Sequence, residues 1–523
     1  MHWADVAASR LKEILGDHRI ATGITPSGHI HVGNMREILT GDLIHRACRD
    51  AGVPSELYYL ADDFDPLRKV YPFLPGSYEE HVGKPLSEIP SPGGDEGTYA
   101  QYFLRPFLES VEELGIRPMV LPSSESYRQG KYAEPAAMII EKREQVREIL
   151  MKVSRRDLPA DWFPYNAKCK ACGRISSTKA VSWERPFVHY RCSCGHSGKA
   201  DTRTDDGKLP WRLDWPARWY WLGVTCEPFG KDHAASGGSY DTSSEIIRSV
   251  LGREPPFPVV YEWIQLKGKG AMSSSSGVVV SGVDMLRMTP PEVLRFLIAR
   301  NQPGRHIDMD PGLGILNLVD EFDRYEEHYY GSPAEGEDEE DRKRTYELSM
   351  VRKPRERSEM ERIVNVPYRH LVTLVQLTKD LDSLIEKIKW TEKIDEFDDR
   401  SMDRLAHRKG CVEFWLENYA PEGVKFSLYD EVPAEEISAL SDEMKTALGG
   451  MREDFITCPW DAESIHNAIY EGSRARGIDP KTTFKAFYRI LMGQDRGPRL
   501  GFFLSTMDRG SILERLDSIL EGP

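Results

Sequence analysis

Apolar residues in the first half of the chain follow two alternating patterns. Short continuous apolar runs, typical of buried strands, cover residues 19–24, 56–61, 117–121 and 259–266. In other segments apolar residues recur every three or four positions, which predicts helices over residues 34–47, 99–114, 134–153 and 243–251. Because strands alternate with helices, we expect a doubly wound parallel sheet, that is, a Rossmann-like α/β domain.

The second half of the chain shows the helical pattern alone. It predicts helices over residues 289–300, 317–330, 358–378, 381–389, 402–418, 434–451, 462–472 and 481–492. An acidic stretch at residues 331–341 has the composition of an exposed loop. We therefore expect an α/β domain over residues 1–285, a connecting helical region over 286–345 and an all-helical C-terminal domain over 346–523.

Composition narrows the class of protein. The chain has 523 residues, of which 40% are hydrophobic, an ordinary fraction for a globular protein. No apolar run is long enough to span a bilayer, and charges occur throughout residues 1–17, so we expect a cytoplasmic protein without membrane contact. The formal net charge of −15 argues against indiscriminate binding of nucleic acids, although a local basic patch can still hold RNA.

The segment between the first strand and the first helix has the pattern of a phosphate-binding turn. It reads TGITPSGHIHVGNMR over residues 22–36. Its strand-breaking residues and its histidines are Pro26, Ser27, Gly28, His29 and His31. Asn34 is suited to cap the following helix, whose N-terminus would offer free backbone N–H groups and the positive end of its dipole to a phosphate. The alternative is an ordinary strand–turn–helix with surface histidines.

Three acidic residues, Asp62, Asp63 and Asp65, follow the second predicted strand. Open α/β sheets bind their ligands at the carboxyl ends of parallel strands. We therefore treat these carboxylates as candidates for ligand contact. A helix cap or a solvated turn is the alternative for each of them.

Four of the eight cysteines lie close together in the sequence, at Cys169, Cys172, Cys192 and Cys194. Two cysteines separated by two residues present both thiolates from one tight turn, and a second pair about twenty residues later suits a closed tetrahedral zinc site. The second pair has a single residue between its cysteines, so His189 or His196 is an alternative ligand. We expect a structural zinc site in an insertion at about residues 160–205.

Two further loops have compositions suited to a nucleotide. The first contains Gly230-Lys-Asp-His followed by small residues, and Asp232 and His233 are its candidates for contact with an adenosine. The second, residues 267–282, reads KGKGAMSSSSGVVVSG. Its candidates for phosphate contact are Lys267, Lys269, Ser273, Ser274 and Ser275. An ordinary polar linker is the alternative for the second loop.

Basic residues gather near the C-terminus, at Arg474, Arg476, Lys481, Lys485, Arg489, Arg496 and Arg499. Phe484, Phe487 and Tyr488 lie among them and are suited to stack on unpaired bases. The alternative is an amphipathic helix whose aromatic residues belong to the core.

Several segments resemble one known family. Residues 31–34, His-Val-Gly-Asn, resemble the HIGH signature of class I aminoacyl-tRNA synthetases. Residues 271–275, Ala-Met-Ser-Ser-Ser, resemble the KMSKS signature with both of its lysines absent. ITPSGHIHVGN, ADDFDPLRKV, HVGKPLSEIP, RLDWPARW, GKDH with GGS, and GPRLG are similar to the class I lysyl-tRNA synthetases of the archaeal type. The resemblance covers nearly the whole chain.

The resemblance implies ATP-dependent ligation of L-lysine to tRNA(Lys) through lysyl-adenylate, with Mg²⁺, by a protein that we expect to be a monomer. It also implies that lysine is activated only when tRNA is bound and that the C-terminal helices read the anticodon. The catalytic phosphate contacts would come from His29, His31, Asn34, Lys267, Lys269, Ser273, Ser274 and Ser275. The other ATP-binding residues would be Pro26, Ser27, Gly28, Gly33, Asp232, His233 and Met272.

The resemblance places the lysine site at Gly23, Thr25, Trp211 (or Trp219) and His233. Lysine also needs a carboxylate for its ammonium, and for this role we expect Asp62 or Asp63. Two alternatives stay open. One is a class I synthetase for another amino acid, such as glutamate, and the other is a catalytically silent tRNA-binding relative, which the absent lysines of the second signature suggest.

Overall fold

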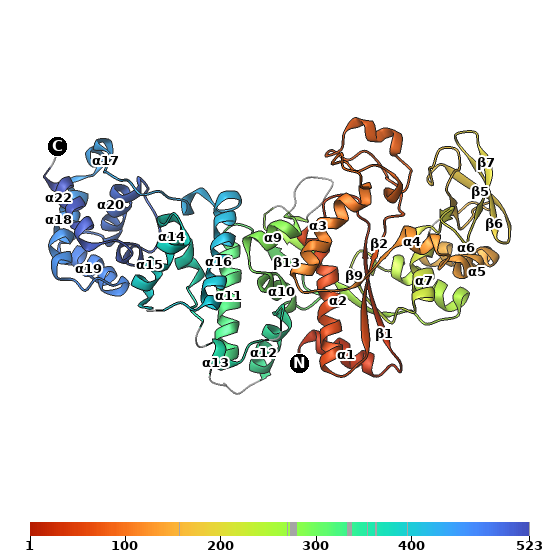
Figure 1. Ribbon diagram of the computed structural model, residues 1–523, viewed down its shortest axis with the longest axis horizontal. Coiled ribbons are helices and arrows are strands. Elements are labelled where there is room, and N and C mark those ends of the chain that lie inside the picture. The colour runs from red at the N-terminus through yellow and green to blue at the C-terminus, as the bar shows by residue number, and fades with distance from the viewer. Residues whose placement is uncertain are drawn as a thin grey trace. The chain divides into compact units, whose positions relative to one another are not determined.

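The computed structural model describes residues 1–155, 157–268, 270–271, 280–331, 337–352, 354–360, 363–394 and 396–521. The chain divides into two compact units (Figure 1). The first contains residues 1–286, 291–310 and 325–354, and the second contains residues 287–290, 311–324 and 355–523. All strands of the described residues belong to the first unit.

The first unit is built on a five-stranded parallel sheet, as the alternating pattern predicts. Its strands are β1 (His18–Ile24), β2 (Ser55–Ala61), β3 (Met119–Pro122), β9 (Cys226–Gly230) and β10 (Phe257–Tyr261). They pair in the order β10-β9-β1-β2-β3, and every pair is parallel. Since β2 lies on one side of β1 and β9 on the other, the chain changes direction across the sheet at β1, and this switch point is where such sheets bind ligands.

The predicted strand over residues 259–266 is two strands in different sheets. β10 ends at Tyr261, and β11 (Ile264–Leu266) pairs with β12 (Gly270–Ala271) and β13 (Ile307–Met309). The backbone N–H of Glu262 donates to the carbonyl of Pro303, which directs the chain out of the parallel sheet. Both strands contribute buried apolar residues, Val259 and Tyr261 from β10 and Ile264 and Leu266 from β11, which explains why they resemble one strand in the sequence.

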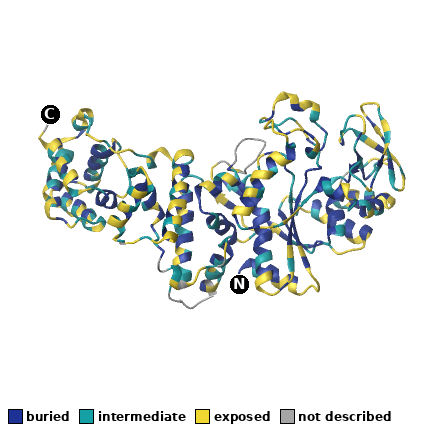
Figure 2. Cartoon of the chain, viewed as in Figure 1, coloured by how far each residue is buried: buried dark blue, intermediate teal, exposed yellow. Residues whose placement is uncertain are grey.

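The helices of the first unit are α1 (Trp3–Lys12), α2 (Val32–Asp50), α3 (Tyr99–Glu113), α4 (Ser123–Arg128), α5 (Ala133–Glu141), α6 (Arg143–Ser154), α7 (Trp211–Leu222), α8 (Ser239–Ile246), α10 (Pro291–Ala299) and α12 (Glu337–Ser349). The predicted helix over 134–153 is divided between α5 and α6 because Lys142 leaves the helical conformation. α2 packs on β1, β2 and β9, and buried residues follow these strands and its inner face (Figure 2).

The insertion predicted at about residues 160–205 is made of short antiparallel strands. β5 (Thr178–Glu184), β6 (Phe187–Cys192) and β7 (Ser197–Asp201) form one sheet. β4 (Asn166–Ala167) pairs with β8 (Gly207–Lys208) at the base of the insertion. The backbone N–H of Ile175 donates to the carbonyl of Gly83, so the insertion also touches the irregular segment that follows β2.

The second unit contains helices and no strand among its described residues. Its helices are α13 (Arg357–Met360), α14 (Tyr368–Leu377), α15 (Leu381–Glu392), α16 (Asp399–Asn418), α17 (Ala434–Ala439), α18 (Asp442–Thr457), α19 (Ala462–Ala475), α20 (Pro480–Met492), α21 (Leu500–Ser505) and α22 (Arg509–Leu520). α9 (Gly282–Met288) and α11 (Leu313–Tyr330) have residues in both units. Phe455, Ile469, Phe487 and Phe503 belong to its core.

Three predicted features of the helical regions are corrected. The predicted helix over 358–378 is interrupted, and α14 starts after Pro367, which fits the start of a helix better than its interior. The helix over 434–451 is divided because Ser441 caps a new one, α18. Part of the acidic stretch over 331–341 is helical, since α12 begins at Glu337. In the part of the chain that the structure describes, no helix has the length and apolar character needed to cross a membrane.

For a substitution of Gly41 by alanine, helix propensity and packing predict opposite effects on the stability of the protein. A Cβ at Gly41 would lie 2.8 Å from Thr22 Cγ2 and 3.1 Å from Leu57 Cδ1. Alanine is favoured over glycine in a helix by about 1 kcal/mol, but overpacking typically costs about 1–3 kcal/mol. We expect Gly41→Ala to lower the melting temperature, measured by circular dichroism. Gly410→Ala in α16, where a Cβ meets no atom within 4 Å, should raise it. A Gly41→Ala protein as stable as the parent would contradict the close packing of α2 on the sheet.

Candidate active site

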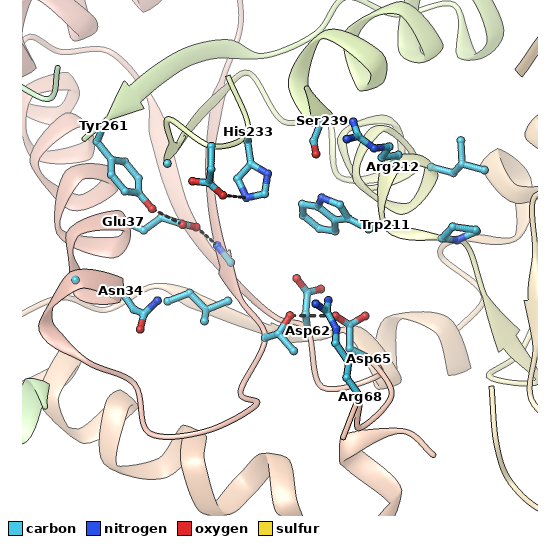
Figure 3. A pocket seen from close by; sticks show the side chains of 18 of the residues that line it. Asn34, Glu37, Asp62, Asp65, Arg68, Trp211, Arg212, His233, Ser239 and Tyr261 are labelled. Atoms are coloured by element: carbon cyan, nitrogen blue, oxygen red, sulfur yellow. Dashed lines mark hydrogen bonds and ion pairs between the residues drawn. The ribbon is translucent and has the colours of Figure 1, made fainter. Parts of the chain in front are cut away.

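A cavity of about 790 Å³ opens at the carboxyl edge of the parallel sheet (Figure 3). Its walls come from the end of β1, the start of α2, the segment after β2, α7, the loop after β9 and the end of β10. These segments are far apart in the sequence and meet at the switch point beside β1. The cavity therefore lies where the topology places a ligand.

The turn between β1 and α2, which carries the HIGH-like signature at residues 31–34 and is called the signature turn below, borders the cavity where α2 begins. The helix begins at Val32, so His31 and not Asn34 occupies the N-cap position. Asn34 is the third helical residue, and its side-chain oxygen accepts a hydrogen bond from the His31 backbone N–H at 3.3 Å. His31, Gly33 and Asn34 all line the cavity, which places the positive end of the helix dipole at its wall.

His31 is a neutral side chain in this setting. Burial lowers the pKa of His31 to about 4, so its ring carries no charge near pH 7. Its Nδ1 is buried and has no hydrogen-bond partner among the described residues. A neutral imidazole still donates one N–H, so the ring is suited to a hydrogen bond with a phosphate oxygen.

The first part of the predicted turn lies outside the cavity lining. Pro26, Ser27, Gly28 and His29 are not among the described residues that line it. The carbonyl of Ser27 accepts a hydrogen bond from the Tyr99 hydroxyl at 2.7 Å, which anchors the turn to α3. The His29 ring packs edge-on against Phe103, with 5.1 Å between ring centroids, and lines a separate cavity of about 330 Å³.

The segment that follows the serine loop is joined to the signature turn. The backbone N–H of Val32 donates to the carbonyl of Val280 at 3.0 Å, and His31 and Ser281 form a β-bridge. Lys267 is exposed, and its Nζ lies 3.8 Å from Asp310 Oδ2. Five of the predicted ATP-contacting residues lie outside the described residues: Lys269, Met272, Ser273, Ser274 and Ser275.

The three acidic residues after β2 have different surroundings. Asp62 is buried, pairs with Arg218 and accepts a hydrogen bond from the Ser123 hydroxyl at 2.9 Å. Asp65 accepts hydrogen bonds from the Thr25 hydroxyl at 3.0 Å and from Lys208 at 2.5 Å. Both line the cavity.

Asp63 has a structural role. Its two oxygens accept hydrogen bonds from the backbone N–H and the hydroxyl of Ser124, at 2.8 and 2.6 Å. It is not among the described residues that line the cavity. Asp63 therefore fits the alternative interpretation as a capping residue at the start of α4.

A buried ion network lies under this wall of the cavity. We define it as Asp62, Asp65, Lys208, Asp214 and Arg218. Lys208 lies 3.7 Å from Asp214, and Arg218 lies 3.2 Å from the same carboxylate, which also accepts the Tyr127 hydroxyl at 2.6 Å. Three carboxylates face two cations, so the ionised network carries one net negative charge. The sequence did not predict Lys208, Asp214 or Arg218 as site residues. Their role depends on ion pairs with residues that are distant in the chain, and only the fold shows these pairs.

The opposite wall is aromatic. Trp211 stacks on Trp215, with ring centroids 5.2 Å apart, and its ring lies 5.9 Å from that of His233. Trp211, Asp232 and His233 line the cavity, whereas Trp219 is buried and donates its indole N–H to Glu227. Burial lowers the pKa of His233, and Asp232 lies 3.5 Å from its Nε2. Of the two tryptophans considered, Trp211 is therefore the one that can contact a ligand.

Glu37 and Tyr261 are cavity residues that sequence reasoning missed. Glu37 Oε1 accepts a hydrogen bond from the Gly23 backbone N–H at 2.6 Å, and Oε2 accepts one from the Tyr261 hydroxyl at 2.8 Å. Burial raises the pKa of Glu37 to about 8. The sequence contained one signal for Glu37. It lies three residues after Asn34 in the predicted helix and directly before Ile38 and Leu39, which are buried in the structure.

Comparison with known proteins gives the family. Residues 1–352 match the family model described as tRNA synthetases class I (K). The chain belongs to this family. Similar relatives include the lysine--tRNA ligase of Picrophilus torridus, which is 46% identical over 522 residues that cover 99% of both chains. The lysine--tRNA ligase of Thermoplasma volcanium is 44% identical and is matched over 100% of both chains. Lysine--tRNA ligase 1 of Methanosarcina acetivorans is 45% identical over 98% of both.

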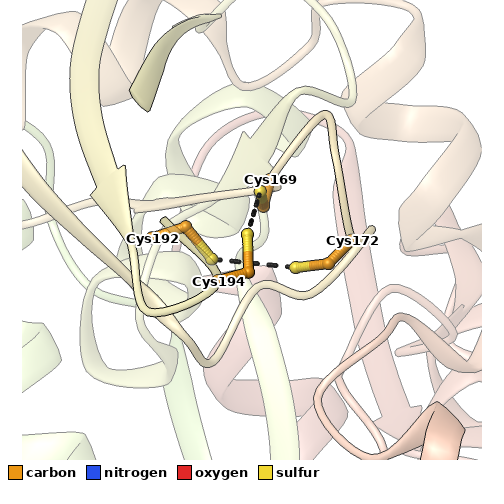
Figure 4. Close-up of side chains that lie close together, drawn as sticks. All are labelled: Cys169, Cys172, Cys192 and Cys194. Carbon is orange, nitrogen blue, oxygen red and sulfur yellow. Dashed lines mark hydrogen bonds between the residues drawn. The ribbon is translucent and has the colours of Figure 1, made fainter. Parts of the chain in front are cut away.

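In this class I synthetase the insertion brings four thiols together (Figure 4). The Sγ atoms of Cys169, Cys172, Cys192 and Cys194 all lie within 4.8 Å of one another. Cys169 and Cys194 are 3.7 Å apart, as are Cys172 and Cys192. A zinc ion with bonds of about 2.3 Å has tetrahedral edges of about 3.8 Å, so these two pairs match such a site and all four thiols lie close enough together to hold one ion.

The two histidines considered as alternative ligands face other groups. His189 Nε2 lies 3.6 Å from Glu184, and the His196 ring packs against Tyr190 at 6.1 Å. Neither belongs to the ligand group found among the described residues. The geometry thus favours a set of four thiolates.

The second unit of the synthetase has a basic cavity of about 550 Å³ between α19, α20 and the turn before α21. Its lining residues are His466, Lys481, Phe484, Lys485, Tyr488, Asp495, Arg496, Arg499 and Leu500. The aromatic residues divide between the two interpretations, since Phe484 and Tyr488 line the cavity while Phe487 is buried against Phe455.

Only some of the predicted basic residues are available at this cavity. Lys485 and Arg489 pair with Asp495 at 2.9 and 2.8 Å, and Arg476 pairs with Asp454. Lys481, Arg496 and Arg499 are exposed and form no ion pair with any described residue. These three side chains are the ones suited to contact phosphates.

Metal content tests the thiol cluster. We expect about one zinc ion per purified chain, measured by atomic emission, because four thiolates at these distances form a closed structural site. Cys172→Ser should lose the zinc and make the insertion sensitive to protease, while Cys458→Ser, outside the cluster, should keep it. Full zinc content in Cys172→Ser would contradict this ligand set.

Proposed function

We propose that this class I synthetase ligates L-lysine to tRNA(Lys) through lysyl-adenylate. The observation that carries the proposal is the single cavity in which the signature turn meets a wall with excess negative charge. A cationic amino acid and a nucleotide need these two environments side by side. The lysine--tRNA ligases that match along the whole chain support the same conclusion.

The reaction proceeds in two steps. A carboxylate oxygen of lysine attacks the α-phosphorus of ATP, the bond to the β-phosphate oxygen breaks, and pyrophosphate leaves. A ribose hydroxyl at the 3′ end of the tRNA then attacks the carbonyl carbon of lysyl-adenylate, and AMP leaves. The protein forms no covalent bond to the substrates, so its contribution is to position them and to stabilise charge on the phosphates.

The phosphates would lie at the N-terminus of α2. Here the neutral His31, Asn34 and the backbone at Gly33 donate hydrogen bonds, while His29 with Pro26, Ser27 and Gly28 supports the turn from behind. Lys267, Lys269, Ser273, Ser274 and Ser275 would contact the pyrophosphate end, with Met272 as a further ATP-binding residue. Asp232 and His233 would contact the ribose. Mg²⁺ would be held mainly by ATP, because Asp62 and Asp65 are already paired with cations, and when bound it neutralises phosphate charge.

Lysine would occupy the space between β1 and α7. Gly23 and Thr25 line this space from the sheet, Trp211 and His233 from the opposite wall, and Asp62 with its network makes the floor negative. Cys169, Cys172, Cys192 and Cys194 would hold a structural zinc ion, which when bound would contribute on the order of 10 kcal/mol to folding of the insertion.

The decisive experiment is ATP–pyrophosphate exchange with the full chain. We expect exchange that depends on lysine and on tRNA(Lys), and aminoacylation of tRNA(Lys) with lysine alone among the amino acids tested. Exchange with glutamate would assign another amino acid. Binding of tRNA without exchange with any amino acid would identify a silent relative.

His31→Ala tests the role of the signature turn. Removing one donor that stabilises developing charge typically slows the chemical step by about 10²–10³-fold. We expect this loss in the rate of adenylate formation, with unchanged melting temperature and tRNA affinity. Near-normal exchange in the variant would contradict the assignment of His31.

The basic cavity of the second unit tests the contact with tRNA. We expect Arg496→Ala combined with Arg499→Ala to weaken tRNA(Lys) binding. The slope of log affinity against log salt should fall by about 1.4, the value for two contacts to single-stranded phosphates. Arg355→Ala combined with Lys379→Ala removes the same charge from exposed positions outside the cavity and should leave the slope unchanged. Equal slopes in the two double variants would exclude this cavity as a tRNA contact.

A further inference from the structure

Arg36 is a buried arginine of α2 and is not among the described residues that line the active-site cavity. Burial lowers the pKa of Arg36 to about 10, which leaves its guanidinium charged near pH 7. No carboxylate of the described residues forms an ion pair with it, and Glu262, whose charge acts on it, pairs with Lys231 at 2.6 Å. A buried cation is costly unless other groups neutralise it, so the atoms around Arg36 determine its role.

Backbone carbonyls take the place of a carboxylate around this guanidinium. Nη1 of Arg36 donates to the carbonyl of Glu262 at 2.6 Å, and Nη2 donates to those of Pro303 and Arg305 at 3.1 and 2.9 Å. Two further carbonyls accept hydrogen bonds at 3.5 and 3.4 Å, one from residue 263 and one from residue 302. Because a guanidinium is planar and its donors have a fixed direction, it holds these two chain segments in one arrangement.

The two segments lead directly into β11 and β13. The strands pair in parallel, with Ile264 opposite Ile307 at their first residues. The backbone N–H of Lys267, which directly follows β11, donates to the carbonyl of Met309 at 2.9 Å. Arg36 therefore binds the chain at the start of both strands, and Lys267, a predicted phosphate contact, lies at the end of one of them.

The chain that continues from Lys267 returns to the same helix. The backbone N–H of Val32 donates to the carbonyl of Val280 at 3.0 Å. Val32 and Arg36 are four positions apart in α2, so they lie on one face of the helix, one turn from each other. One face of α2 thus holds the chain before Lys267 and again at Val280, on both sides of the predicted serine contacts in the sequence.

We propose that Arg36 is a positioning residue for the pyrophosphate end of ATP. By holding β11 on α2, it keeps Lys267 in a fixed position relative to His31 and Asn34, the donors at the start of the same helix. The inference rests on the proposed function. Arg36 acts through these groups and not by contact with ATP, and it also supports the cavity wall, because its guanidinium carbon lies 5.9 Å from the centre of the Tyr261 ring.

The two steps of the reaction depend differently on this arrangement. In the first step negative charge moves onto the leaving pyrophosphate, so the donors at α2 and at Lys267 must keep their separation. In such a site a displacement of about 1 Å can cost about 10²-fold in rate. The second step transfers lysine from the adenylate to tRNA and involves no pyrophosphate. A disturbed Arg36 should therefore slow the first step and spare the second.

The test measures the two steps separately in the full-length Arg36→Lys protein with a tRNA(Lys) transcript. This substitution keeps the charge, but an ammonium is a compact point charge and cannot span the carbonyls of two segments as the planar guanidinium does. We expect adenylate formation, followed by rapid quench with labelled ATP, to slow by about 10- to 100-fold. The KM for pyrophosphate in the reverse reaction should rise. Transfer of lysine from added lysyl-adenylate to tRNA should proceed at the parent rate.

Arg46→Lys is the matched control. Arg46 lies on the same helix, donates to the carbonyls of Met350 and Gly115 at 2.5 and 3.4 Å, and pairs with Asp42 at 2.9 Å. Burial lowers the pKa of Arg46 to about 10, as it does for Arg36, so the two substitutions disturb cations in similar settings. We expect Arg46→Lys to lower the melting temperature and to leave the ratio of the two rates as it is in the parent.

A double substitution tests whether Arg36 acts through Lys267. Lys267→Ala should slow adenylate formation in the parent and in the Arg46→Lys protein, but it should add little in the Arg36→Lys protein, because coupled residues are not additive. Hydrogen exchange gives the structural counterpart. The backbone amides of residues 264–267 should exchange faster in Arg36→Lys than in the parent, and in Arg46→Lys they should exchange at the parent rate.

The ratio of the two rates is measured below the melting temperature of each variant, so a loss of stability alone does not change it. Unchanged adenylate formation in Arg36→Lys would overturn the proposal. Equal slowing of both steps, or full additivity with Lys267→Ala, would also overturn it, because either result would leave Arg36 without a specific link to the pyrophosphate end. A parent protein without lysine-dependent exchange would instead refute the proposed function itself.

Discussion

The buried ion network of Asp62, Asp65, Lys208, Asp214 and Arg218 holds three parts of the first unit in one arrangement. Asp62 and Asp65 follow β2, Lys208 ends β8 at the base of the insertion, and Asp214 and Arg218 belong to α7. A buried charge that loses its partner costs several kcal/mol. The sheet edge, the insertion and the aromatic wall therefore keep their positions together.

This network also lets one cavity accept substrates of opposite charge. The network side is negative, while the N-terminus of α2 offers a positive dipole end and neutral donors to phosphates. Thr25 connects the two sides, since it directly follows β1 at the start of the turn and donates its hydroxyl to Asp65. The thiol cluster helps to position Lys208 although it does not touch it, because β4, just before Cys169, pairs with the strand that carries Lys208.

Much of the fold could be predicted from local patterns, and the exceptions have physical causes. β1 and β2 follow from continuous apolar runs. β9 was missed because Cys226–Gly230 contains Glu227 and Pro228. Glu227 is buried in the structure and accepts hydrogen bonds from the indole N–H groups of Trp215 and Trp219. The helix breaks at Lys142 and before α18 depend on single residues that a periodic pattern does not register.

The sequence by itself determined most of the strands and helices along the chain, the signature turn and the spacing of the four thiols, because these depend on residues close together in the chain. The tertiary structure decided which carboxylates of the cavity are neutralised. Asp65 and Lys208 are 143 positions apart, and Glu37 and Tyr261 are 224 apart. The charge available to a ligand depends on such distant partners, and only the folded chain brings them together.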